Sequence, residues 1–282
     1  MLAALDPLGL TTIAPQPGLE VFRILFGLVC TLYFAQRLRS AGLCLGPGGL
    51  SDNLWRARGQ PWRLSPFAWL PRSTRLAQSV LLLGLLGSLG VALGFSVPWC
   101  AAVVFGTQLI LTAELSFLAT GIDFIVLMMN GLLALSEAGA ALALDAPVGL
   151  ADTPATAVWA TRLMQLQICA IYSFTVVQKL IEHQWRSGWA VYYAVQALVV
   201  ARRWSHRLAA WPLAPRLLTW ATLVVQVVAP FALWWEPTRL WALALLLGLH
   251  LGLDLCLRLW PFQWLMLASL PLFIQPSDLG WP

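Results

Sequence analysis

The feature that most constrains this chain is a series of apolar runs, each long enough to cross a bilayer. A helix needs about 20 predominantly apolar residues to cross the hydrocarbon core. The runs are continuous rather than alternating, so they predict helices and not the strands of a closed barrel. They are Leu19–Leu38, Ala77–Phe95, Val97–Ala113, Ile122–Leu144, Val158–Leu180, Leu213–Trp235 and Leu240–Leu257.

Two shorter apolar stretches complete the pattern. Leu259–Ile274 contains Pro261 and Pro271 and is either a full span or a half-inserted segment. Gly188–Ala201 is shorter still, which is typical of an interfacial or re-entrant segment. We therefore expect an all-α integral membrane protein, a polytopic bundle of about seven to eight transmembrane helices. We expect one transmembrane domain over residues 1–282, with no soluble C-terminal domain.

The composition excludes a soluble domain. Only 10% of the residues are charged and 60% are hydrophobic, whereas soluble domains carry about 25% charged residues. Many of the 16 tryptophans stand at the ends of the runs, as anchors at the headgroup level do.

The location predicted is a bacterial plasma membrane, crossed several times. We expect the lipid bilayer as a partner and no nucleic acid. The cysteines are widely spaced without a C-x-x-C pair, so we expect no metal.

Basic residues mark the cytoplasmic side of a membrane protein. Fourteen of the 17 lie in three connections that alternate correctly to share one side. The rule places these connections in the cytoplasm and the N-terminus outside. They hold Arg37, Arg39, Arg56, Arg58, Arg63, Arg72 and Arg75, then Lys179, Arg186, Arg202, Arg203, Arg207 and Arg216, and finally Arg258.

The fifth run carries a polar stripe. Gln165, Tyr172 and Lys179 follow one another at intervals of seven, and Glu182, His183 and Arg186 continue the same face if the helix extends. Two turns of about 3.6 residues each cover nearly the same distance, so these side chains share one face. A polar face in an apolar span should point into the bundle, because exposing it to lipid is costly.

Lys179 is the only lysine in the chain, and the other basic residues are arginines. A desolvated lysine can lose its proton, whereas arginine stays charged. A neutral amine in an apolar pocket is a base or a nucleophile. The competing interpretation is a lysine that extends toward the headgroups at the end of a span.

Two other polar pairs lie inside predicted spans. His250 and Asp254 are four residues apart, so they share a helix face and are predicted to pair. The pair is either functional or a packing contact between helices. Glu20 and Arg23 are predicted to form a local ion pair, and Arg23 is alternatively a contact for an anionic headgroup or substrate.

Several motifs occur together in a fixed order. They are Phe22–Gly27 (FRILFG), Gly48–Asp52, Gly131–Ala134, the series Gln167, Tyr172, Lys179, Trp185 and Gly188, His250, and finally Phe262–Phe273. From about residue 19 to 275 the chain thereby resembles the HTTM (horizontally transferred transmembrane domain) family, whose best-known member is the vitamin K-dependent γ-carboxylase.

The resemblance implies a quinone-dependent activity. In the carboxylases, the lysine that matches Lys179 deprotonates vitamin K hydroquinone, and the quinol anion reacts with O2. A glutamate side chain then loses its γ-proton and gains CO2. The cofactors implied are a reduced, vitamin K- or menaquinol-like quinone, O2 and CO2, and the substrate implied is a small peptide or protein. As hypotheses, the catalytic residues are Lys179, Tyr172 and His250, and the substrate- or cofactor-binding residues are Gln165, Gln167, Arg23, Trp185 and Asp254.

The chain also departs from the carboxylases. They carry Asn-Asn-His just before the motif of the fourth span, where this chain has Phe124-Ile125-Val126. Their lysine faces the lumen, whereas the distribution of basic residues places Lys179 on the cytoplasmic side. Two explanations of this difference are open. Either the arginines line a substrate vestibule, or the chain has a true inversion in the membrane. The alternative function is a non-catalytic membrane factor for maturation or export of a small peptide or toxin. A transporter is disfavoured, because no inverted repeat is present.

Overall fold

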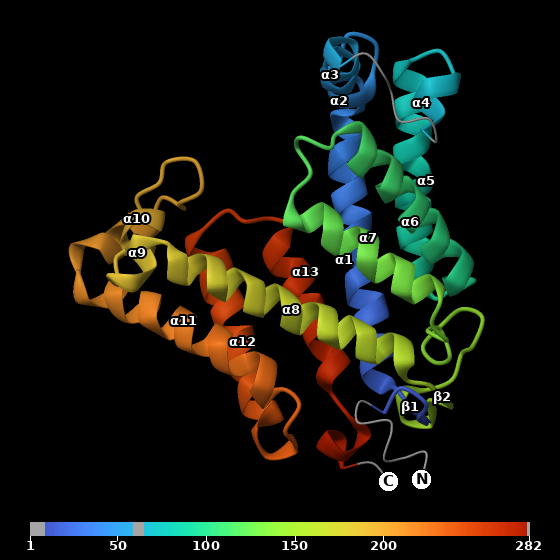
Figure 1. Cartoon of the computed structure of the whole chain (residues 1–282). Coiled ribbons are helices and arrows are strands. Elements are labelled where there is room, and N and C mark those ends of the chain that lie inside the picture. Colours follow the sequence, from blue (N-terminus) through green and yellow to red (C-terminus); the bar gives the residue numbers. More distant parts are fainter. Residues whose placement is uncertain (1–8, 59–64, 281–282) are drawn as a thin grey trace. The chain divides into compact units, whose positions relative to one another are not determined.

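The structure is a computed structural model that describes residues 9–58 and 65–280. It is almost entirely helical, which confirms the predicted all-α class (Figure 1). Of the basic residues counted above, Arg63 lies outside the described residues. The described chain divides into two compact units, residues 1–162 and residues 163–282, and each is described by itself.

The first unit is built on three long helices. They are α1 (Pro17–Arg39), α5 (Thr74–Leu93) and α6 (Val97–Glu114), and α7 (Gly121–Ala134) packs on α6. Short helices α2 (Ala41–Leu45), α3 (Leu50–Arg58) and α4 (Pro66–Trp69) connect α1 to α5, and η2 (Leu150–Asp152) follows α7. A two-stranded antiparallel ribbon joins β1 (Ile13–Pro15) to β2 (Ala155–Ala157).

Small residues let these helices approach one another closely. A Cβ atom placed on Gly27 of α1 would lie 2.6 Å from the backbone nitrogen of Ala92 on α5. On Gly84 of α5 it would lie 2.6 Å from the ring of Phe34. Such contacts are typical of membrane helices, whose association depends on close packing. The sequence ends α5 clearly: Gly94 adopts a left-handed conformation (φ 72°), and its N–H caps the last turn.

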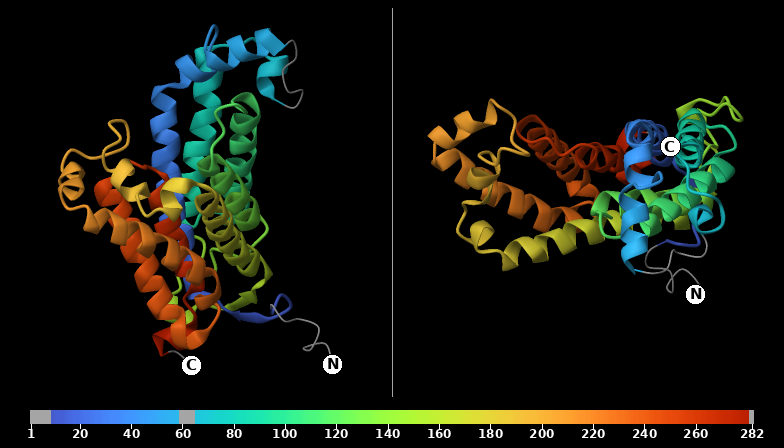
Figure 2. Two further views of the ribbon diagram at one scale, coloured as in Figure 1. Left: turned by 60° about the vertical axis from the view of Figure 1, so that its left-hand side comes forward. Right: turned by 90° about the horizontal axis from the view of Figure 1, so that it is seen from above.

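The second unit contains most of α8 (Trp159–Ile181), followed by α11 (Leu213–Ala232) and α12 (Glu236–Cys256). Between α8 and α11 lie α9 (His183–Arg186), α10 (Ala190–Ala194) and η3 (Ser205–Ala210). The chain continues through α13 (Phe262–Ser269), η4 (Leu270–Phe273) and η5 (Pro276–Leu279). α11 and α12 pack against each other (Figures 1 and 2).

Five of the described helices are long and apolar enough to cross a membrane. They are α1, α5, α6, α11 and α12. α8 matches the predicted run Val158–Leu180 to within one residue at each end. The segment Phe262–Phe273 is shorter, as a half-inserted segment would be. The protein is thus an integral multi-pass membrane protein.

One predicted helix boundary was wrong. The run Ile122–Leu144 is helical only to Ala134, because Glu20 and Arg23 of α1 bind the backbone that follows. Glu20 accepts from the N–H groups of Gly139 and Ala140, and Arg23 donates to the carbonyls of Ala141 and Leu142. The fifth run does not extend beyond its predicted end, since Glu182 is extended (ψ 125°) and the polar stripe stops with α8 at Ile181.

Candidate functional site

The second unit encloses a mostly apolar cavity of about 340 Å³. Its wall includes Ile171 from α8, Val191 from α10, Leu218 from α11, Leu253 from α12 and Met266 from α13. Gly248 and Gly252 of α12 also face it, and a Cβ atom on either would meet nothing within 4 Å. Ligand sites are typically apolar hollows of this kind with a few convergent polar groups.

Lys179 lies at one end of this cavity. Its Nζ donates to Oε1 of Gln226 on α11 at 2.5 Å and lies 5.1 Å from the centre of the Trp185 ring. Among the described residues, no carboxylate forms an ion pair with it. The amine is therefore held by a neutral amide and an aromatic face at the edge of an apolar space.

A chain of three polar side chains forms a second part of the cavity wall. The Tyr172 hydroxyl lies 2.8 Å from Nε2 of His250, and Nδ1 of His250 lies 2.5 Å from Oε1 of Gln263. An amide oxygen only accepts, so Nδ1 carries a proton and Nε2 of the neutral ring accepts from Tyr172. This assignment follows from the hydrogen-bond network. The Tyr172 oxygen keeps its lone pairs for a group in the cavity.

The predicted stripe on α8 faces the interior, as expected. Tyr172 is 1% exposed and Gln165 is 4% exposed. Lys179, Tyr172, His250 and Trp185 all line the cavity, so four of the proposed site residues come together. Because the helix α8 stops at Ile181, Trp185 reaches the cavity from the separate helix α9.

The other proposed site residues lie elsewhere. Gln165 donates to the carbonyl of Leu272 at 2.6 Å, and Gln167 is half-buried outside the cavity lining. Arg23 belongs to the first unit, where it pairs with Glu20 at 2.9 Å, as predicted, and donates to four backbone carbonyls.

The predicted pair of His250 with Asp254 was wrong. His250 forms hydrogen bonds with Tyr172 and Gln263 instead. The Oδ2 atom of Asp254 lies 3.7 Å from Nη2 of Arg202. The helix spacing puts both residues on one face, but the better partners come from other segments of the chain.

Gln226 and Gln263 are site residues that the sequence interpretation missed. Each is a lone amide within an apolar stretch, and a polar residue inside a span is a functional candidate by default. That signal was sufficient to find them, but nothing in the spacing connects either one to α8.

The fold and cavity define a polytopic helical membrane protein with an intramembrane polar site. Its family follows from comparison: the model of the HTTM domain matches residues 14–278, and the chain belongs to that family. The chain is similar to the uncharacterized protein YitO of Bacillus subtilis (strain 168), at 29% identity over 122 residues. This match covers 41% of the chain and 39% of the relative, well under two thirds of its length. No solved structure matches.

Proposed function

We propose that this protein is a membrane-embedded, γ-carboxylase-like enzyme in which Lys179 is the base. It uses a reduced quinone, O2 and CO2 to modify a small peptide or protein at a bacterial plasma membrane. The single observation that supports the proposal best is the placement of the Lys179 amine, without an ion pair, at the edge of an apolar cavity.

The residues present fit a quinol. A flat apolar ring suits the walls of the cavity, and the two ring oxygens suit polar groups at its edge. Burial disfavours the charged form of an amine, and a neutral amine accepts a proton. Lys179 then takes a proton from a ligand hydroxyl, while Gln226 holds the amine in place. A reduced quinone, when bound, supplies the electrons that reduce O2.

Tyr172 has a positioning role in this proposal. Its proton is committed to Nε2 of His250, so its oxygen accepts a hydrogen bond from a hydroxyl in the cavity. Gln263 holds the His250 tautomer that makes this possible. The Trp185 ring lies beside the Lys179 amine in the cavity lining.

Two substitutions of Lys179 test the proposal. Lys179→Ala and Lys179→Arg should both lower activity by about 10²–10⁴-fold, because arginine cannot act as a neutral base. Ser173→Ala is the control, since Ser173 is an exposed residue of α8 outside the cavity lining. The readout is the mass increase of one CO2 on a co-expressed peptide, together with the quinone that copurifies with the protein.

The Lys179→Arg variant separates the two candidate functions. Full carboxylation by this variant contradicts the role of Lys179 as a neutral base. A protein that carries no quinone and modifies no peptide contradicts the enzyme. The non-catalytic maturation factor then remains, and a scaffold should tolerate an arginine in place of Lys179.

A further inference from the structure

The chain from the start of α9 to just beyond α11 has a one-sided charge. Residues 183–235 contain five arginines and no aspartate or glutamate. Arg203 and Arg207 are exposed and, within the described part of the chain, form no ion pair. Arg202 differs, because it is bound to Asp254. The exposed arginines thus leave positive charge uncompensated within the protein.

An apolar loop tip lies just before these arginines. Leu198 and Val199 are each 87% exposed. The base of the loop is fixed, because Arg202 N donates to the carbonyl of Cys256 at 2.9 Å and Arg258 N donates to that of Val200 at 2.6 Å. Exposing two large aliphatic side chains to water costs free energy. A nonpolar environment at this point removes that cost.

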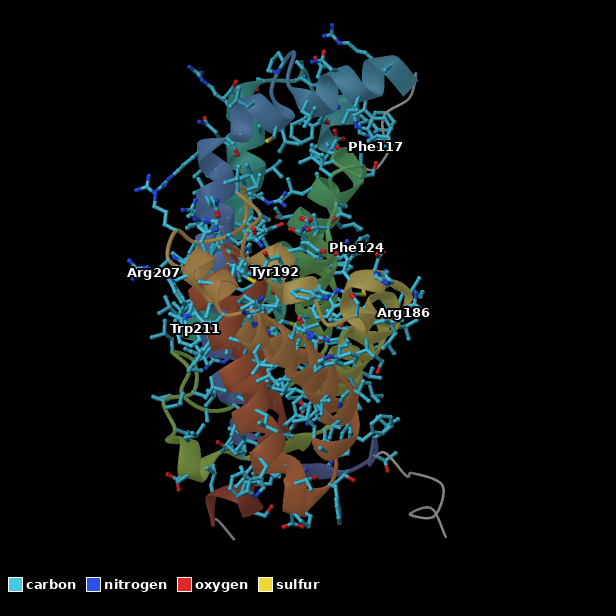
Figure 3. The ribbon with its side chains drawn as sticks, turned by 90° about the vertical axis from the view of Figure 1, so that its left-hand side faces the viewer. Phe117, Phe124, Arg186, Tyr192, Arg207 and Trp211 are labelled. Carbon is cyan, nitrogen blue, oxygen red and sulfur yellow. The ribbon has the colours of Figure 1, made fainter. Side chains whose placement is uncertain are left out.

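Two exposed tryptophans follow the loop tip in the sequence. Trp204 is 45% exposed and Trp211 is 76% exposed. Trp211 stands two residues before α11, one of the helices able to cross a membrane. Figure 3 shows Arg207 and Trp211 at the same edge of this unit. Tryptophan at the start of a span is typical of the headgroup region.

We propose that this surface binds anionic phospholipid headgroups while its apolar tip inserts into the leaflet. We call it the lipid-docking loop, and it consists of Leu198, Val199, Arg203, Trp204, Arg207, Trp211 and Arg258. The charge selects anionic lipids, because an anionic surface attracts exposed basic residues. The apolar tip and the adjoining span select a bilayer over a soluble partner. The proposal is independent of the enzymatic function.

Counting bound lipids tests the charge requirement. The protein is reconstituted in phosphatidylcholine vesicles that contain phosphatidylglycerol, extracted in mild detergent, and analysed by native mass spectrometry. Each arginine should contribute about fivefold in affinity. Arg203→Ala/Arg207→Ala should therefore bind phosphatidylglycerol about thirtyfold more weakly, and high salt should reduce binding to the unchanged protein.

The control removes two exposed arginines elsewhere. Arg39→Ala/Arg75→Ala changes the net charge equally, and both residues are exposed in the first unit. This variant should lose less phosphatidylglycerol than Arg203→Ala/Arg207→Ala, because Arg39 and Arg75 lie outside the lipid-docking loop. Equal loss in the two double variants, or no loss in Arg203→Ala/Arg207→Ala, overturns the proposal.

Hydrogen exchange tests the insertion of the tip. The amides of residues 196–204 should exchange more slowly in nanodiscs with phosphatidylglycerol than with phosphatidylcholine alone. Leu198→Ser/Val199→Ser should remove that difference, because the serines gain nothing from hydrocarbon. Equal exchange in the two lipids overturns the proposal, as does protection that depends on protein concentration, which indicates a second copy of the chain.

Discussion

At the scale of single residues, the surroundings of each ionisable side chain distinguish a structural role from a functional one. Arg23 and Glu20 are both almost fully buried, and their polar atoms bind the backbone around residues 91–92 and 139–142. Lys179 is only partly buried and faces a cavity. The sequence marked all three as intramembrane ionisable residues but could not tell a fixed charge from one beside an open space.

Removing Arg23 should strongly destabilise the first unit. Arg23→Met leaves the carboxylate of Glu20 buried without its ion pair, at a cost of about 3–5 kcal/mol. The measurement is thermal unfolding of the detergent-solubilised protein. Arg39→Met is the control, because Arg39 is an exposed residue on the same helix. A loss no greater than that of the control would show that Glu20 finds another partner.

Gln226 offers a test with opposite outcomes for two roles of Lys179. Gln226→Glu places a carboxylate beside the amine and favours its charged form. If Lys179 is a base, this variant should lose about tenfold or more in activity while its unfolding temperature rises or stays level. Gln226→Leu is the comparison and should lose less activity. A fully active Gln226→Glu protein contradicts the role of a neutral amine.

At the scale of elements, helix boundaries depended on contacts that the sequence does not reveal. The apolar run after Ala134 is long enough for a helix, yet residues 139–142 bind Glu20 and Arg23 instead. The end of α5 was easier to predict, because Gly94 is a local stop signal. Local signals are thus sufficient for the end of α5, whereas long-range hydrogen bonds determine the end of α7.

The α3 helix should depend on pH through Asp52. The backbone N–H of Gly48 donates to the Asp52 carboxylate at 2.8 Å and, with Arg56, holds the pKa of Asp52 below its usual range against the opposing effect of burial. A lowered pKa stabilises the helix above the unfolded value of about 3.9. This stabilisation is lost as the pH falls through the lower, folded value.

Protection of the amides in residues 46–56, corrected for intrinsic exchange, measures this effect. Protection in the natural protein should fall as the pH is lowered below about 4. Asp52→Asn should have lower protection at pH 5 and little change below it. A parallel decline in both proteins assigns the pH dependence to another group.

At the scale of the whole molecule, the spans and the basic residues predict a topology. α11 is able to cross the membrane, so His206 before it and Glu236 after it should lie on opposite sides. The rule for basic residues places the His206 end in the cytoplasm. Both residues are exposed and suitable for labelling.

Labelling of introduced cysteines tests that topology. In sealed inside-out vesicles, a membrane-impermeant maleimide should modify His206→Cys but not Glu236→Cys, and right-side-out vesicles should give the reverse. Peptide mapping separates these sites from the five native cysteines. Labelling of His206→Cys from outside would place the basic connections outside and favour the explanation that their arginines line a substrate vestibule.

The sequence by itself determined the class of protein, most of the helices and the face of α8 that is buried. These properties follow from hydrophobic runs and from the helical repeat, which are local. Only the tertiary structure decided that Gln226 and Gln263 join Lys179, Tyr172 and His250 around one cavity. These residues meet because separate helices pack together, and no repeat in the sequence encodes that packing.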